Sequence, residues 1–157
     1  MKILLATDGS EFSEAAVDQI ASHFPADSEV RVISVAKPPY YQTFEPWSGM
    51  DLTLYEEMEK SVREGARAAV EKAAAKLRAR DGSPKLSVTT EVLSGSPQEV
   101  ILDEAEAFGA DLIVLGSHGY GALDRFLLGS VSQAVALHAK CSVEIVRRPK
   151  THTSESK

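Results

Sequence analysis

Short strand-like runs alternate with amphipathic stretches along this chain. Two of the runs, residues 3–6 and 111–116, are apolar apart from Asp111 at the start of the second, which is typical of strands buried on both faces. Further β-type runs lie at residues 30–35, 86–93 and 143–146. Between the runs, apolar residues recur every three or four positions, which predicts helices at residues 13–24, 51–80, 97–108 and 129–137.

This alternation predicts a single α/β domain of three layers. We expect a five-stranded, mostly parallel sheet with helices on both faces, a Rossmann-like arrangement. The domain is expected over residues 1–148, followed by a polar C-terminal tail at residues 149–157. In such open sheets, ligands bind beyond the carboxyl ends of the strands, where the strand order reverses.

Two local features refine the pattern. Ser96, with Pro97 next to it and Glu99 three residues on, predicts a capping box and a proline in the first helical turn. Residues 36–50 contain three prolines and four aromatic residues without a regular period, and they predict a long loop. That loop either takes part in function or merely covers core or a partner chain, and the sequence leaves both interpretations open.

Composition excludes several classes of protein. The 17 Lys and Arg residues against 23 Asp and Glu residues give a net charge of −6, which argues against broad binding of nucleic acid or anionic membranes. The single cysteine, Cys141, excludes an internal disulfide and a multi-cysteine metal site. No apolar run reaches transmembrane length, and the first residues do not resemble a signal peptide. We therefore expect a cytoplasmic protein.

Glycine and serine gather after the predicted fourth strand, in the pattern Gly116-x2-Gly119-x9-Gly129-Ser130. Gly129 and Ser130 lie at a helix start, where free N–H groups and the helix dipole favour an anion. Ser130 and Ser132 add hydroxyl donors, and the glycines let the backbone approach a ligand closely. Each glycine alone fits a tight turn, but the combination predicts a phosphate site that is neither a Walker A loop nor a dinucleotide fingerprint.

The residues after the predicted first strand form a second candidate site. Thr7 and Asp8 stand at the carboxyl end of the run and precede Gly9 and Ser10. Asp8 is either a ligand-binding residue or a cap of the following turn and helix. Its position at a strand end favours the binding role.

From Lys2 to about Arg148, the sequence resembles the universal stress protein family. Residues 3–10, Ile-Leu-Leu-Ala-Thr-Asp-Gly-Ser, look like the family's first strand and its aspartate. Residues 116–132 look like its nucleotide signature, Gly-2x-Gly-9x-Gly-(Ser/Thr). The resemblance implies an adenine nucleotide alpha hydrolase-like fold. It also implies that the chain binds ATP, or ADP or AMP, with Mg²⁺ accompanying the phosphates and no metal site made by the protein.

The resemblance also implies which residues form the site. They come from three predicted strand ends and one helix start: Thr7, Asp8, Val35, Gly116, Ser117, His118, Gly119, Gly129, Ser130, Val131 and Ser132. In the family pattern, Asp8 contacts the adenosine, the Val35 backbone faces adenine and Gly116 contacts the ribose. Gly119 and residues 129–131 cradle the phosphates, largely through main-chain N–H groups. Departures are small, since Ala6 and Ser142 stand where relatives often have proline.

Three functions compete at this point. The first is an adenine-nucleotide-binding regulator of the stress response, which the resemblance implies is a homodimer paired through the last strand, Val143 to Arg147. The second is a slow ATPase, although we expect no catalytic residue because His118 has no carboxylate close in sequence. The third is a dimerisation module without nucleotide. The complete signature favours the first.

Overall fold

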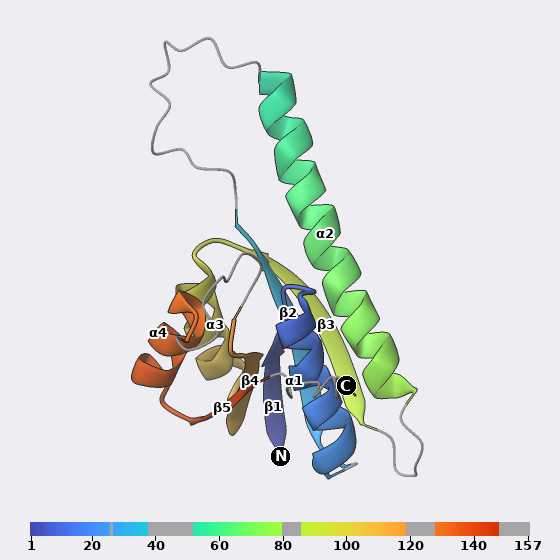
Figure 1. Cartoon of the computed structure of the whole chain (residues 1–157), viewed down its shortest axis with the longest axis vertical. Helices are drawn as coiled ribbons and strands as arrows, with labels where there is room; N and C mark the ends of the chain where they lie inside the picture. Colours follow the sequence, from blue (N-terminus) through green and yellow to red (C-terminus); the bar gives the residue numbers. More distant parts are fainter. Residues whose placement is uncertain (26, 38–51, 80–85, 119–127, 148–157) are drawn as a thin grey trace, which may run out of the picture.

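The computed structural model describes residues 1–25, 27–37, 52–79, 86–118 and 128–147. Strands and helices alternate through these ranges (Figure 1). The strands are β1 (Lys2–Ala6), β2 (Glu29–Ala36), β3 (Ser87–Ser94), β4 (Leu112–Gly116) and β5 (Ser142–Val146). The helices are α1 (Glu11–His23), α2 (Leu52–Arg78), α3 (Pro97–Phe108) and α4 (Ser130–His138).

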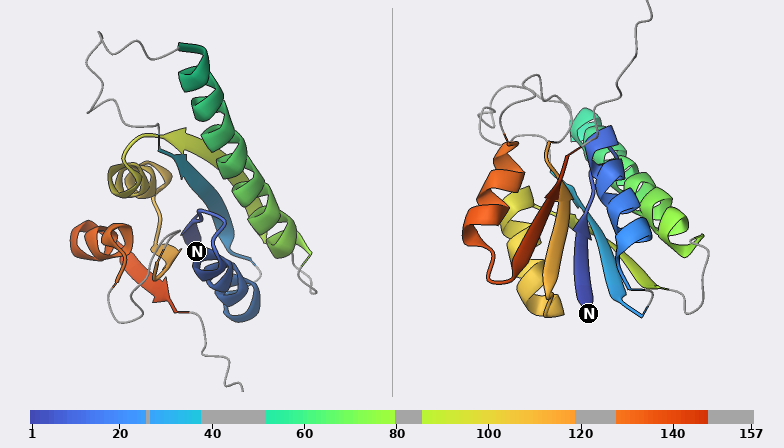
Figure 2. Two further views of the ribbon diagram at one scale, coloured as in Figure 1. Left: turned by 45° about the horizontal axis from the view of Figure 1, so that its top comes forward. Right: turned by 60° about the horizontal axis from the view of Figure 1, so that its bottom comes forward.

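The strands form one sheet in the order β3-β2-β1-β4-β5, and every neighbouring pair is parallel. Figure 2 shows α1 and α2 on one face of this sheet and α3 and α4 on the other. The predicted three-layer α/β fold is therefore confirmed. Because the chain lays down β1, β2 and β3 in one direction and then β4 and β5 in the other, the order reverses between β1 and β4. A crevice for ligands is expected at that point.

Two apolar clusters hold the layers together. On β1, Ile3 and Leu5 face α1 and α2, while Leu4 faces α3 and α4, and all three are fully buried. Neighbouring β4 is divided in the same way, with Val114 on one side and Ile113 on the other. Central strands covered on both faces have no polar face, which explains the uninterrupted apolar runs in the sequence.

The helix starts depart from the sequence prediction in two details. Helix α1 begins at Glu11, two residues earlier than predicted, because the Ser10 side chain caps it by accepting a hydrogen bond from Ser13 N at 3.3 Å. At α3, Pro97 occupies the first turn as predicted, but the capping box is wrong. The Ser96 side chain makes no capping bond, and its carbonyl accepts from Val100 N at 3.0 Å instead. The fixed φ of proline prepares the first turn without a side-chain cap.

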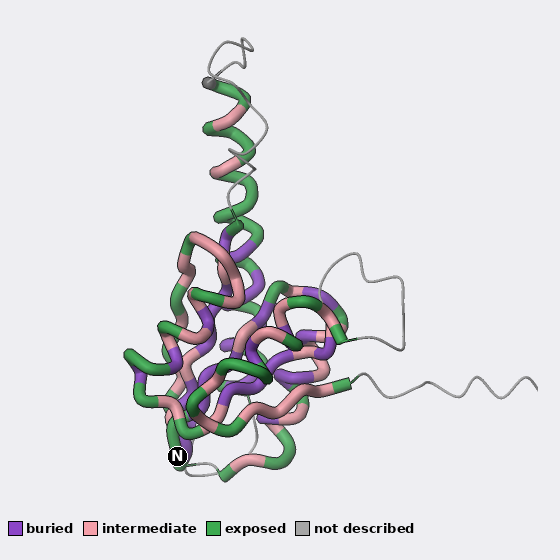
Figure 3. The backbone as a smooth tube through the Cα atoms, turned by 90° about the vertical axis from the view of Figure 1, so that its left-hand side faces the viewer, coloured by how far each residue is buried: buried purple, intermediate pink, exposed green. Residues whose placement is uncertain are grey.

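Helix α2 extends well past the sheet. One face of its second half is buried from Ala66 to Leu77, whereas Leu54, Met58 and Val62 on the first half are exposed. The Arg63 guanidinium contacts Ser94 at the end of β3, and residues 52–62 add about 16 Å of helix before this contact. Figure 3 shows this half standing clear of the body. Despite its length, neither α2 nor another helix in the described ranges is apolar enough to cross a membrane.

Candidate functional site

The turn from β1 into α1 holds Thr7 and Asp8 at the carboxyl edge of the sheet. Thr7 Oγ1 accepts a hydrogen bond from Gly9 N at 3.2 Å and donates one to Ser13 Oγ at 3.0 Å. Asp8 Oδ1 accepts from Ser10 N at 2.9 Å, and Gly9 takes the left-handed φ of 80° that favours glycine. Asp8 thus stabilises the turn, while Ser10 and not Asp8 caps the helix.

Ser117 joins the two ends of the glycine signature. Its carbonyl accepts hydrogen bonds from Gly129 N at 2.9 Å and from Ser132 Oγ at 3.0 Å, and its own N–H donates to Val146 O at 2.9 Å. Ser132 Oγ also lies 2.9 Å from the Gly129 carbonyl. Ser117 is buried, so this serine fixes the start of α4 against the end of β4 from behind.

Gly116 is required by packing. A Cβ at this position would lie 2.6 Å from the carbonyl carbon and oxygen of Phe12 and 2.8 Å from Ser13 N. The first turn of α1 therefore packs directly on the Gly116 backbone. Gly129 is less constrained, because its Cβ would lie 3.2 Å from Ser117 O and 3.3 Å from His118 Cα.

The start of α4 carries backbone donors that have no acceptor within the helix. Gly129 is the N-cap and supplies no side-chain cap, so the N–H groups of residues 130–132 have no acceptor one turn back within the helix. Their dipoles add to the positive end of the helix. The Ser132 hydroxyl is engaged by the Ser117 and Gly129 carbonyls, which leaves Ser130 as the exposed hydroxyl beside these donors. This arrangement suits an anion such as phosphate.

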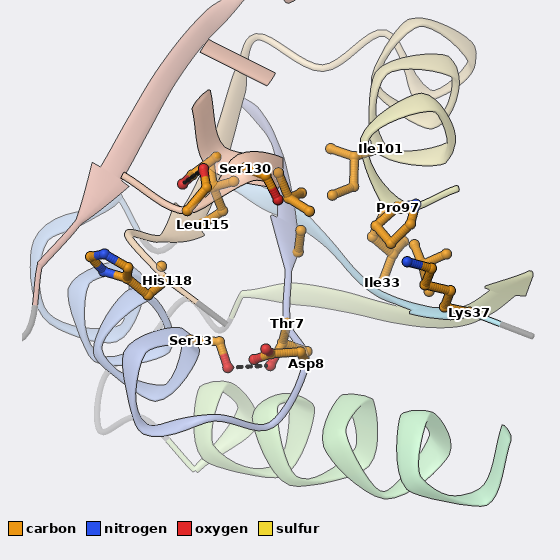
Figure 4. Close-up of a pocket in the computed structure, with 16 residues that line it drawn as sticks. Thr7, Asp8, Ser13, Ile33, Lys37, Pro97, Ile101, Leu115, His118 and Ser130 are labelled. Carbon is orange, nitrogen blue, oxygen red and sulfur yellow. Dashed lines mark hydrogen bonds between the residues drawn. The ribbon is translucent and has the colours of Figure 1, made fainter. Parts of the chain in front are cut away.

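A cavity of about 640 Å³ lies between these two turns at the reversal point of the sheet (Figure 4). Its wall contains most of the predicted site residues: Thr7, Asp8, Val35, Gly116, His118, Gly129, Ser130, Val131 and Ser132. Ser117 supports the wall from behind. The predicted residue Gly119 and nearly all of the predicted 36–50 loop lie outside the described residues.

Sequence reasoning missed one side of the cavity. Ile33 on β2 and Pro97 and Ile101 on α3 form an apolar wall, with Lys37 at its rim. In Figure 4 these side chains lie across the cavity from His118. One signal for this wall was present in the sequence. Pro97 and Ile101 are four residues apart at the start of a helix that follows a strand, so they lie on the same helix face.

Two neighbouring side chains, those of Ser117 and Phe12, hold the His118 ring in place. Its Nδ1 lies 3.0 Å from Ser117 Oγ, and its ring centroid is 5.3 Å from that of Phe12. Its Nε2 is buried without a hydrogen-bond partner. The described ranges also contain no group of three or more His, Cys, Asp or Glu side chains that could hold a metal ion.

Comparison with known proteins agrees with this geometry. The model of the universal stress protein family matches residues 1–147. The chain belongs to the universal stress protein family. Universal stress protein MJ0531 of Methanocaldococcus jannaschii is 36% identical over 151 residues, which cover 95% of this chain and 83% of that protein. The solved structure of hypothetical protein MJ0577 is 27% identical with a TM-score of 0.79, covering 96% of this chain and 97% of that one.

Two further solved structures of the family share the fold and carry adenine nucleotides. An Arabidopsis thaliana family member with AMP bound is 19% identical, with a TM-score of 0.64, and the match covers 99% of this chain and 96% of that one. A universal stress protein in complex with cAMP is 23% identical, with a TM-score of 0.55 and coverage of 94% and 96%. At these identities, the likeness shows the fold alone.

Proposed function

We propose that this universal stress protein binds an adenine nucleotide in the cavity between β1, β4 and α4, with ATP as the principal ligand. The observation that carries the proposal is the start of α4, which has no side-chain cap and where residues 130–132 line a cavity with an apolar opposite wall. A nucleotide has the same division, because its phosphates are anionic and its base is flat and largely apolar. The cavity volume is within the usual range for small-molecule sites.

The lining residues fit the parts of the ligand in order. Ile33, Val35 and Ile101 offer an apolar surface for adenine, and the Asp8 carboxylate accepts hydrogen bonds from ribose hydroxyls. Ser130 and the first turn of α4 receive the phosphates. Mg²⁺ would be held chiefly by phosphate oxygens and water, as is usual for this ion. The AMP and cAMP complexes of the two relatives support the choice of adenine.

We infer a regulatory role and not efficient hydrolysis. Phosphoryl transfer needs a group that orients water and positive charge on the leaving phosphate. Among the described residues, the cavity lining at the start of α4 comprises Gly129, two serines and Val131, with His118 nearby. The cation of this lining, Lys37, lies on the opposite, apolar wall. The His118 Nδ1 is already paired with a serine hydroxyl. Bound nucleotide would instead shift the protein between conformations or partners.

The proposal is tested on protein purified without added nucleotide. We expect that denaturation releases ATP, ADP or AMP, identified by chromatography and mass. Calorimetric titration of the stripped protein with ATP and Mg²⁺ should then give saturable heat, whereas CTP, which has a smaller base, should bind more weakly. Released ADP or AMP together with measurable turnover would favour the ATPase. No release and no heat with ATP would refute nucleotide binding at this site.

We further propose that two copies pair through β5 to form the regulatory dimer. Val146 directs its carbonyl toward β4, where it accepts from Ser117 N. Because backbone groups alternate along a strand, Val143 and Ile145 direct theirs to the outer edge. Val143, Ile145 and Val146 are all partly exposed. A symmetric pair of such edges satisfies the free groups of both copies.

Light scattering at micromolar concentration is expected to give twice the chain mass of 16.9 kDa. The variant Val143→Pro removes an outward N–H that β4 does not use, so it should be folded and monomeric by the same measurement. A control variant, Thr90→Pro on the opposite edge, should stay dimeric. A monomeric mass for the wild-type protein would contradict the proposed dimer.

A further inference from the structure

The outer edge of β3 carries backbone groups that the sheet does not use. Among the described strands, β3 pairs with β2 alone. At its two ends, Ser87 N donates to Ser28 O at 3.3 Å and Gly95 N donates to Ala36 O at 3.4 Å. Because backbone groups alternate along a strand, the even-numbered residues 88, 90, 92 and 94 direct their N–H and C=O groups away from β2.

Helix α2 lies along this edge in both Figure 1 and Figure 2 and engages its two ends. Arg78 Nη2 donates to Val88 O at 3.0 Å, and Arg63 Nη2 lies 3.4 Å from Ser94 Oγ. The contact at Val88 agrees with the outward direction of the even-numbered carbonyls. Between these two contacts, the described residues supply no partner for the outward groups of Thr90 and Val92.

A groove of about 370 Å³ lies at this unpaired section, between α2 and β3. Its wall on α2 contains Arg63, Arg67, Val70 and Glu71, and its floor on β3 contains Thr90, Glu91 and Val92. Arg67 is exposed, and its guanidinium has no hydrogen bond or ion pair within the described ranges. The groove thus combines free backbone groups with an arginine that lacks a counter-ion there.

We propose that this groove binds an extended acidic segment of another protein, which adds a strand to β3. Thr90 and Val92 each offer one N–H and one C=O, so the segment gains up to four backbone hydrogen bonds. A carboxylate on the segment pairs with Arg67, in the planar geometry that guanidinium groups favour. Glu71 and Glu91 border the groove, so the acidic side chain belongs beside the arginines and not along the whole strand.

Arginines also serve to protect sheet edges from unwanted pairing. Arg78 fits that role, because it occupies the Val88 carbonyl. Arg67 does not, since the groove beneath it stays open over the two residues whose backbone groups are unpaired. Glu71 and Glu91 balance the two arginines of the groove, and Arg63 is paired with Glu59 at 3.8 Å. Within the described ranges, Arg67 is therefore the cation of the groove that an acidic side chain of a partner can pair with.

The test uses a fluorescein-labelled peptide, Thr-Val-Glu-Val-Glu-Val-Thr, and a second peptide with lysine in place of both glutamates. We expect saturable anisotropy with the acidic peptide below about 1 mM and none with the basic one. Amide exchange should show new protection of the Thr90 and Val92 N–H groups. Thr89 and Glu91, which already bond to β2, should not change and serve as the internal reference.

Two variants separate the parts of the site. Arg67→Ala should weaken the acidic peptide about tenfold, as expected for one charge-assisted hydrogen bond. Thr90→Pro removes an outward N–H without disturbing the pairing with β2, and it should abolish binding in a protein that remains folded by circular dichroism. The matched control is Lys76→Ala, on the same helix but paired with Asp18 of α1 at 2.5 Å, and it should leave the affinity unchanged.

Each other outcome overturns the proposal. If the acidic peptide does not bind, these arginines serve only to protect the sheet edge. Binding that survives Thr90→Pro with no new amide protection would be a loose charge contact and not strand addition. Protection of the Val143 and Ile145 amides would place the peptide on the opposite edge of the sheet.

Discussion

Replacing Gly116 with alanine is expected to lower the free energy of unfolding by about 3 kcal/mol, a large effect for a single methyl group. The added Cβ would stand 2.6 Å from the carbonyl carbon and oxygen of Phe12 and 2.8 Å from Ser13 N. All three are backbone atoms in the first turn of α1, so they cannot swing aside as a side-chain tip can. The helix must shift away from β4, and the contacts of α1 with the sheet loosen as a result.

Urea unfolding followed by circular dichroism measures this loss. The matched control is Gly65→Ala in the middle of α2, where nothing lies within 4 Å of the added Cβ. That variant should gain about 0.5–1 kcal/mol, because alanine is the better helix former. If the free energy of unfolding of Gly116→Ala stayed within about 1 kcal/mol of the wild-type value, the close approach of Phe12 would not constrain this position. The proposed ribose contact would then be the remaining reason for a glycine here.

The outcome bears on how the glycine signature is interpreted. The family resemblance implies that Gly116 contacts a ribose, whereas a tight turn is the alternative for each glycine taken singly. The structure shows that the packing requirement at Gly116 is real and severe. It also places Gly116 in the cavity wall, so the packing requirement and the proposed ribose contact concern the same residue.

The sheet was predictable because its central strands are buried on both faces. Ile3, Leu4 and Leu5 have no polar neighbour between them, and a run of this kind fits a covered parallel strand. Helix periodicity was less informative on α2. Leu54, Met58 and Val62 continue the same spacing as the buried Ala66 and Leu77, yet they are exposed. Periodicity identifies one face of a helix but not what that face meets.

The site was predictable where it is local in sequence and not where it is assembled by the fold. The spacing of glycine and serine predicts the turns at Thr7 and at Gly129. The wall formed by Ile33 and Ile101 does not, because these ordinary core residues come together through the crossing of two elements. Ser117 stays a predicted ligand residue, and the two hydrogen bonds that its carbonyl accepts, from Gly129 N and Ser132 Oγ, could not be predicted from spacing alone.

The variant Ser130→Pro is expected to weaken ATP binding at least tenfold while the fold stays intact. Proline is favoured at the first position of a helix and has no N–H, so it removes a donor from the start of α4 without breaking a helical hydrogen bond. Gly129 already has the extended conformation, with φ −60° and ψ 150°, that a residue before proline adopts. The free energy of unfolding should therefore change by less than about 1 kcal/mol.

Calorimetric titration with ATP and Mg²⁺ measures the effect, and Ser130→Ala is the matched control because it removes the hydroxyl and keeps the N–H. If the phosphates rest on main-chain N–H groups at the positive end of α4, Ser130→Ala should lose much less affinity than Ser130→Pro. Equal losses would assign the contact to the hydroxyl. Unchanged affinity in both variants would show that the phosphates do not bind at the start of α4, and it would contradict the proposed site. The Ser132 hydroxyl could not take over the contact, because two carbonyls already engage it.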